Sequence, residues 1–238
     1  MDEKIEQLRE LVVSSDNIVF FGGAGVSTES GIPDFRSPDG LYNQHYDYPP
    51  ETILSHSFFV KDPETFYRFH RDKLVIDGAK PNAAHLKLAE LERMGKLKAV
   101  ITQNIDGLHQ AAGSVNVLEL HGSVERCYCM KCGRSHSADE INHGTGIPRC
   151  GCGGIIRPDV VLYEESLDQD ILQRSIMAIR AADVMIVGGT SLNVYPAAGL
   201  INYYRGKKLV LINKSETPYD DYASLIFHES IGKVLSAI

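Results

Sequence analysis

Four of the five cysteines in the sequence form two close pairs, Cys129-x2-Cys132 and Cys150-x-Cys152. Four thiolates suit the tetrahedral geometry of zinc, and the glycine that follows the second cysteine of each pair allows a tight turn around the metal. Because four thiolates leave no open coordination position, we predict that this zinc is structural and not catalytic. Cys127 remains an alternative ligand, since it lies close to Cys129 in the sequence.

A glycine-rich turn follows the first long apolar run of the chain. Residues 18–21 are apolar without interruption, which is typical of a strand buried on both faces of a parallel sheet. Gly22, Gly23 and Gly25 come next, and exposed main-chain amides at such a turn attract a pyrophosphate. The dinucleotide-binding fingerprint is incomplete, because its third glycine would fall at Thr28. A purely structural turn is the alternative interpretation.

Polar residues follow several predicted strands at the point where each strand ends. Ligands bind at this edge in open α/β sheets, so the clustering predicts a binding site there. For Thr190 and Ser191, capping of a local helix is the alternative interpretation. The residues concerned are Gly23–Ser27, Gln103–Asp106, His121, Thr190–Ser191 and Asn213.

These residues need a scaffold of strands and helices to bring them together. Ile5, Leu8, Leu11 and Val12 recur at helical spacing, so we expect a helix before the first strand. Further strands are expected at 97–102, 117–120, 160–162, 184–187 and 208–213. Helices are expected from Asp62 and Pro63 onward, at 82–94 and 168–180, and at the end of the chain. Strands that alternate with helices predict the α/β class, with a doubly wound parallel sheet.

The composition is that of a globular protein, with 43% hydrophobic and 23% charged residues in a chain of 238. A net charge of -7 and a pI near 5.7 argue against a nucleic-acid-binding surface. No stretch approaches the roughly 20 apolar residues of a membrane span, and the N-terminal segment lacks a signal-peptide core. An odd, clustered set of cysteines indicates metal binding in a reducing compartment. We therefore expect a cytoplasmic protein.

Several of these motifs together resemble one protein family. Gly23–Ser27, Gly31–Arg36, Thr102–His109 and His121–Ser123 are similar to the signature motifs of the sirtuins, the NAD-dependent protein deacylases, here of bacterial type. The resemblance covers nearly the whole chain, with the motifs in the family's order. It implies that NAD is a co-substrate and lies between a Rossmann-like large domain and a smaller domain.

The resemblance also implies how the chain is divided. The Rossmann-like NAD-binding domain would consist of residues 1–36, 81–122 and 155–238. The small domain would combine a helical insertion at 37–80 with a zinc-binding module at 123–154.

His121 corresponds to the catalytic histidine of the family. Imidazole titrates near neutrality, so it can accept a hydroxyl proton and return it later. The resemblance places Asn104 and Asp106 beside the nicotinamide with catalytic roles, and assigns a ribose hydroxyl to Gln103. The implied NAD contacts are Gly23, Ala24, Gly25, Ser27, Thr28, Asp34, Phe35, Arg36, Gln103, Asn104, Ile105, Asp106, His121, Gly188, Thr190, Ser191, Asn213, Lys214 and Ile231. We expect His85, His109 and His143 to serve only packing or surface roles.

Residues 157–165 resemble the family segment that pairs with the acyl-lysine peptide. An extended peptide would add main-chain hydrogen bonds to Val161, Leu162 and Tyr163 on one side and to the segment around Val194 on the other. Many relatives carry glycine where this chain has Glu164. Because this segment is expected to pair with an acyl-lysine peptide, acetylated-lysine proteins are the expected partners.

The implied function is that of an NAD-dependent protein-lysine deacetylase, which releases nicotinamide, free lysine and O-acetyl-ADP-ribose. A mono-ADP-ribosyltransferase is the nearest alternative. Two further alternatives are binding modules and not enzymes. They are a zinc-stabilised NAD-sensing module and a zinc-ribbon nucleic-acid binder. His121, Asn104 and Asp106 argue against a passive sensor, and the acidic balance argues against nucleic acid. The oligomeric state stays open.

The expected acyl group is acetyl. Relatives that prefer succinyl or malonyl lysine carry a Tyr-x-x-Arg pair on the helical insertion, whose arginine can bind the acyl carboxylate. The matching stretch here is Tyr67-Arg68-Phe69-His70, which has the tyrosine and lacks the arginine. Without that partner, a carboxylate would enter the site unpaired, which is costly.

Overall fold

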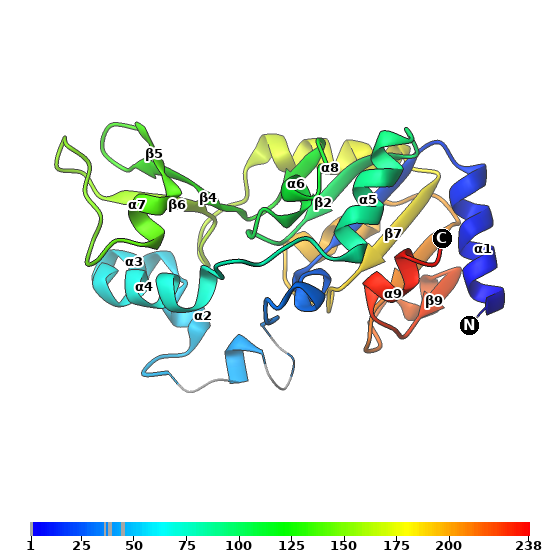
Figure 1. Ribbon diagram of the computed structural model, residues 1–238, viewed down its shortest axis with the longest axis horizontal. Helices are drawn as coiled ribbons and strands as arrows, with labels where there is room; N and C mark the ends of the chain where they lie inside the picture. The colour runs from blue at the N-terminus through cyan, green and yellow to red at the C-terminus, as the bar shows by residue number, and fades with distance from the viewer. Residues whose placement is uncertain (1, 36, 38–39, 44–45) are drawn as a thin grey trace.

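The computed structural model of the protein describes residues 2–35, 37, 40–43 and 46–238. A six-stranded sheet and a three-stranded sheet lie in different parts of an elongated molecule (Figure 1). Both chain termini lie at the end that carries the larger sheet, as Figure 1 also shows.

The larger sheet is parallel throughout and has the order β3-β2-β1-β7-β8-β9. Its direction of winding reverses between β1 and β7, which is the switch point where open α/β sheets bind ligands. This confirms the predicted fold class. The strands are β1 (Ile18–Gly22), β2 (Leu97–Thr102), β3 (Val117–Glu119), β7 (Val184–Gly188), β8 (Leu209–Ile212) and β9 (Leu225–Phe227). The sequence did not indicate the edge strand β9.

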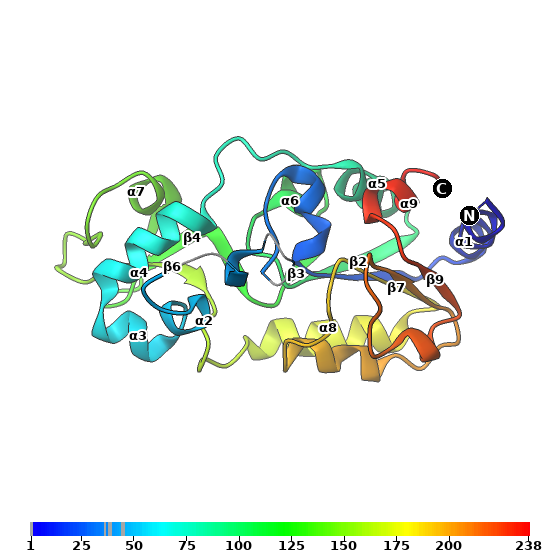
Figure 2. The same cartoon turned by 90° about the horizontal axis from the view of Figure 1, so that it is seen from below.

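Helices cover both faces of this sheet, because alternate residues of each buried strand point to opposite sides. In β1, Ile18 and Phe20 pack on one side, and Val19 and Phe21 pack on the other; all four are fully buried. The first side is covered by α1 (Asp2–Ser14), α5 (Ala83–Arg93) and α9 (Ile231–Leu235). The second is covered by α8 (Gln169–Ala181) and the 3₁₀ helix Ala197–Tyr203. Figure 2 shows α8 and the pair α5 and α9 on opposite sides of the strands.

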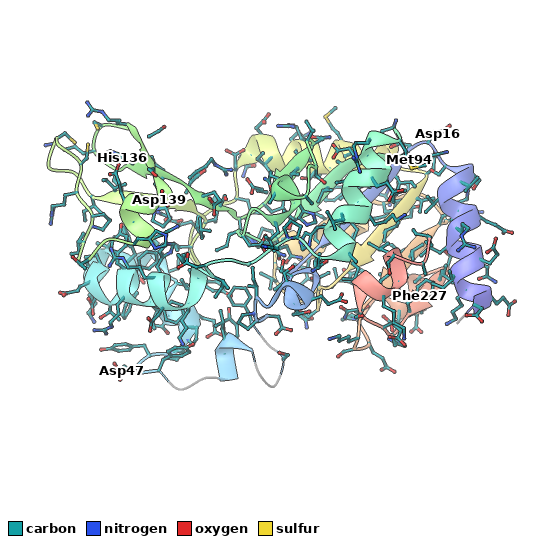
Figure 3. All side chains as sticks on the ribbon, in the orientation of Figure 1. Asp16, Asp47, Met94, His136, Asp139 and Phe227 are labelled. Carbon is teal, nitrogen blue, oxygen red and sulfur yellow. The ribbon has the colours of Figure 1, made fainter. Side chains whose placement is uncertain are left out.

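The smaller sheet is antiparallel, with β4 (Gly122–Cys129) between β5 (Ser135–Ser137) and β6 (Ile156–Val160). β6 begins earlier than the expected extended segment at 160–162, because Arg157 and Pro158 pair with β4. His136 on β5 and Asp139 on α7 (Ala138–Asn142) lie at the opposite end of the molecule from Phe227 (Figure 3).

The helical insertion packs against this smaller sheet. It contains α2 (Pro50–Ile53), α3 (His56–Lys61), α4 (Pro63–Phe69) and the π-helix His70–Leu74. As predicted, Pro63 occupies the first turn of α4 and the Asp62 side chain caps it by accepting a hydrogen bond from Thr65 N at 3.0 Å. Phe59, Phe66 and Tyr67 of the insertion share one buried cluster with residues of β4, β6 and α7. The exact domain boundaries stay a prediction.

Candidate active site

The turns that follow β1 and β7 pack main chain against main chain. Gly25 N donates to Gly189 O at 2.8 Å, and Gly23 N donates to Gly188 O at 3.3 Å. A Cβ on Gly25 would lie 2.8 Å from Gly189 Cα, a distance that side-chain carbons do not reach. These glycines are therefore required by the contact between the two turns. Sequence reasoning, which considered a single turn and its ligand, did not predict this contact.

Three polar residues from two strand ends form a hydrogen-bonded network. The Ser27 hydroxyl donates to Asp106 Oδ2 at 2.6 Å, and Asn104 Nδ2 donates to Ser27 Oγ at 3.0 Å. The main chain fixes two of these residues, because Asp106 Oδ1 accepts from Leu108 N and Asn104 N donates to Thr102 Oγ1, each at 3.0 Å. The network presents a carboxylate and an amide in defined positions, which suits a ligand that carries a carboxamide.

A second contact joins the ends of β2 and β7 across β1. Gln103 Nε2 donates to Thr190 Oγ1 at 3.0 Å, and the same hydroxyl accepts from Leu192 N at 3.2 Å. The bond from Leu192 N stabilises a turn and does not cap a helix, since the next helix begins at Ala197. The bond to Gln103 is not local and places both side chains at the switch point.

His121 lies directly between β3 and β4, at the same edge of the sheet. Its Nδ1 is 2.9 Å from Gln103 O, and because a carbonyl oxygen only accepts, Nδ1 carries the proton. Nε2 of the neutral ring is then free to accept a proton from another molecule. Burial lowers the pKa of His121 from the ordinary 6.5, although the bond to Gln103 acts in the opposite direction. The ring is therefore neutral at pH 7, as a general base requires.

The remaining predicted ligand residues differ in their surroundings. Phe35 packs edge-on against Tyr42, with ring centroids 5.5 Å apart, and Asp34 Oδ1 accepts from Ser37 N at 2.7 Å. Asn213 follows β8 and Lys214 is exposed beside it. Ile231 is buried in the core, where its side chain fills the space that a side chain on Gly188 would occupy. Arg36 lies outside the described residues.

The four cysteines of the two predicted pairs form one cluster, with their sulfur atoms all within 4.8 Å of one another. Cys129 Sγ lies 3.5 Å from Cys152 Sγ, and Cys132 Sγ lies 3.8 Å from Cys150 Sγ. Zn–S bonds of about 2.3 Å in a tetrahedron place sulfur atoms about 3.8 Å apart. The donor set therefore fits zinc and offers no open position.

Both cysteine pairs lie on the expected turns. Gly133 N donates to Cys129 O at 2.9 Å and Gly153 N donates to Cys150 O at 2.8 Å, with left-handed φ values of 71° and 82° at the glycines. Cys127 lies outside the four-sulfur cluster and is 4% exposed in the apolar core of this part of the molecule.

Residues 23–196 match the Sir2 family. The chain belongs to the Sir2 family. A protein named NAD-dependent protein deacetylase from Clostridium acetobutylicum is 60% identical over 240 residues, which cover 99% of this chain and 98% of that protein. A protein of the same name from Clostridium perfringens is 59% identical over 242 residues, which cover 100% and 99%.

Solved structures of the family are similar along the whole chain. A structure described as Sir2 with a p53 peptide and NAD+ has a TM-score of 0.86 and 43% identity, and the match covers 97% of this chain and 95% of that one. A Sir2 structure with a deacetylated p53 peptide and 3'-O-acetyl ADP ribose has a TM-score of 0.90 and 42% identity, with coverages of 98% and 96%.

In this sirtuin the predicted peptide-binding segment is attached to the helical insertion. Tyr163 N donates to Leu54 O and His56 N donates to Tyr163 O, each at 3.0 Å. Val161 N donates to His121 O at 3.0 Å, so the same segment also contacts the candidate base. Leu162 is buried and Tyr163 is 39% exposed. Val194 lies beyond β7, before the 3₁₀ helix.

An ion pair that sequence reasoning did not single out supports this segment. Arg157 Nη1 donates to Glu165 Oε1 at 2.7 Å, and Leu162 N donates to Glu165 Oε2 at 2.9 Å. Burial would raise the pKa of Glu165, but its bonds to Arg157 and Leu162 lower it to about 2. The sequence shows only an arginine and a glutamate eight residues apart, which does not predict that they pair.

The surroundings of His85 and His109 agree with the expected packing role. Both are buried, their rings lie edge to face at 4.7 Å, and burial lowers the pKa of His109 to about 3. Within the described ranges, no helix has the length and apolar character needed to cross a membrane.

Proposed function

We infer that the protein is an NAD-dependent protein-lysine deacetylase. Membership of the Sir2 family and the two relatives named NAD-dependent protein deacetylase support this activity. The overall reaction converts NAD, acetyl-lysine and water into nicotinamide, lysine and O-acetyl-ADP-ribose. The observation that supports it most in this chain is His121, which lies at the carboxyl edge of the sheet with Nδ1 bound to Gln103 O and Nε2 left without a proton.

NAD supplies the ADP-ribose group that receives the acetyl group. Asn104, Ile105 and Asp106 would hold the nicotinamide, with Ser27 keeping the carboxylate of Asp106 in place. His121 would accept a proton from a ribose hydroxyl, because its ring is neutral and its Nδ1–H is already bound. The other NAD contacts proposed are Gly23, Ala24, Gly25, Thr28, Asp34, Phe35, Arg36, Gln103, Gly188, Thr190, Ser191, Asn213, Lys214 and Ile231.

The acetylated substrate would bind as an added strand between Val161–Tyr163 and the segment around Val194. The main-chain bonds of Tyr163 to the helical insertion keep the first of these extended. We also assign the protein to the cytoplasm, where reducing conditions keep cysteines available to a metal.

The competing functions predict different products. A mono-ADP-ribosyltransferase would attach ADP-ribose to a target protein and leave acetyl groups in place. An NAD sensor would consume neither NAD nor acetyl-lysine. The decisive experiment incubates the protein with an acetyl-lysine peptide in the presence and absence of NAD. We expect loss of the acetyl group only with NAD, and an unchanged peptide in both samples would overturn the proposed function.

The acid limb of the pH–activity profile should have its midpoint below pH 6.5. A base must be unprotonated, and burial lowers the pKa of His121 below this ordinary value. The fraction of neutral imidazole, and with it kcat for deacetylation, should therefore reach half of its maximum at a pH below 6.5 and rise to a plateau toward pH 8. A profile whose acid limb has its midpoint above 6.5 would contradict this assignment.

The enzyme should prefer acetyl-lysine to succinyl-lysine by at least about tenfold in kcat/KM. Tyr67 is fully buried and donates to Ile156 O at 2.6 Å, and burial lowers the pKa of His70 to about 4, which leaves it uncharged. Arg71 is bound to the main-chain oxygens of Ile141 and Gly146, at 2.7 Å each. These residues thus offer a succinyl carboxylate no free cation.

Competition between acetyl and succinyl peptides of one sequence measures this preference. Equal or higher kcat/KM on the succinyl peptide would refute it.

A further inference from the structure

Glu164 has a backbone conformation that favours glycine. Its φ is 75°, and among the described residues only Leu192 shares this property without being glycine. Glu165 N donates to Leu162 O at 3.1 Å, which closes a four-residue turn with Glu164 in its third position. Turns with a positive φ at this position normally contain glycine or asparagine there. Strained residues of this kind gather at functional sites, so a glutamate here calls for an explanation.

The carboxylate of Glu164 is held in one orientation. Its Oε2 accepts from Ser57 N and its Oε1 accepts from the Ser57 hydroxyl, both at 2.9 Å. Ser57 lies in the first turn of α3, and the main chain of Tyr163 is bound to Leu54 and to His56, the first residue of that helix. The glutamate is thus fixed to a supported element, although its side chain is exposed.

The charge of Glu164 is not neutralised, in contrast to that of its neighbour. Glu165 has an ion pair with Arg157 and accepts a hydrogen bond from His56, whose Nδ1 is 2.7 Å away. Within the described part of the chain, Glu164 has no cationic group within 4.0 Å. Both carboxylate oxygens of Glu164 keep lone pairs beyond those that Ser57 uses, so a further donor can bind.

Glu164 also directly follows the segment proposed to pair with the substrate. In an added strand, side chains lie about 4.5–5.5 Å from those opposite and about 7–8 Å from their diagonal neighbours. A lysine or arginine within two residues of the acetyl-lysine can span such a distance. The strain at Glu164 then serves to place a fixed negative charge at the rim of the peptide site.

We propose that Glu164 is a specificity-determining residue that favours substrates with a lysine or arginine within two residues of the acetyl-lysine. The inference rests on the proposed function, because it concerns the same peptide site. An exposed pair of this kind changes kcat/KM by about twofold to fivefold, and salt weakens it.

The test uses acetyl peptides of one sequence that differ only in carrying Lys, Gln or Glu at one position within two residues of the acetyl-lysine. Wild-type kcat/KM should fall in the order Lys, Gln, Glu by about twofold to fivefold at each step, with smaller steps at high salt. Glu164→Gln, which is close in shape, should remove most of this order. Glu164→Lys should reverse it.

Glu10→Gln provides a matched control, because it removes one negative charge from an exposed position on α1. Its peptide order should equal that of the wild type. Glu164→Gly is a second variant, which relieves the backbone strain and removes the charge, and it should show no order either.

Three results would overturn the inference, and they are distinguishable. An active wild-type enzyme that treats the three peptides equally would refute the selection. An equal loss on all peptides in Glu164→Gln would show that the residue only caps α3. If no peptide loses its acetyl group with wild-type protein and NAD, the proposed function itself fails.

Discussion

Replacing His121 by alanine should lower the rate of deacetylation by about 10²–10⁴, the usual contribution of a general acid or base. Its Nδ1 is bound to Gln103 O, and burial keeps the ring neutral, so Nε2 is available as the proton acceptor. Release of nicotinamide should suffer less than overall turnover, because the proposed proton transfer follows that step. Steady-state kinetics and nicotinamide exchange measure the two effects separately.

NAD affinity is the control for this variant. Calorimetric titration should give a similar Kd for His121→Ala and wild type, since the ring is not a main NAD anchor in this account. His143→Ala is the matched control, because His143 is exposed and lies in the small part of the molecule, and it should keep wild-type turnover. Wild-type turnover in His121→Ala would mean that another residue is the base.

Removal of zinc should unfold the smaller sheet and its surroundings. Structural zinc sites contribute about 10–16 kcal/mol of apparent binding free energy, which for such sites is folding free energy. The cluster holds β4 to the loop of the second cysteine pair, and Cys129 and Cys150 are buried. Chelation or Cys132→Ala should therefore increase hydrogen exchange across residues 122–160, with less effect in the six-stranded sheet.

The zinc content separates the ligands from their neighbour. We expect about one zinc per wild-type chain and a loss of zinc in Cys132→Ala. Cys127→Ser should keep its zinc, because Cys127 lies outside the four-sulfur cluster. Loss of zinc from Cys127→Ser together with retention in Cys129→Ser would show that the assignment of ligands is wrong.

The parallel sheet was predictable because its central strands are short, unbroken apolar runs such as residues 18–21. The edge strand β9 was not, since three residues, Leu225–Phe227, provide too little periodicity. The antiparallel sheet was also missed, because β4 carries the charged residues Glu125 and Arg126 between buried positions and contains a register shift. Spacing pointed to the four cysteines, because metal geometry restricts ligand spacing within the sequence, but it left Cys127 as an alternative that the structure places outside the cluster.

Contacts between distant residues explain what the sequence could not reveal about the site. Motifs pointed to Ser27 and Asp106 separately, but their hydrogen bond joins positions 79 residues apart. The same holds for the packing of Gly25 on Gly189, because position 25 must be glycine to avoid a clash with the main chain of a distant turn. The glycine that many relatives carry at the position of Glu164 marked it as unusual, but only its φ of 75° shows that the backbone there is strained.

The most direct test of the central claim is the stoichiometry of products, measured by mass spectrometry after the protein is mixed with NAD and an acetyl-lysine peptide. The account predicts one nicotinamide and one O-acetyl-ADP-ribose for each lysine freed. Free acetate formed without nicotinamide would contradict it, and so would ADP-ribose attached to protein while the peptide keeps its acetyl group.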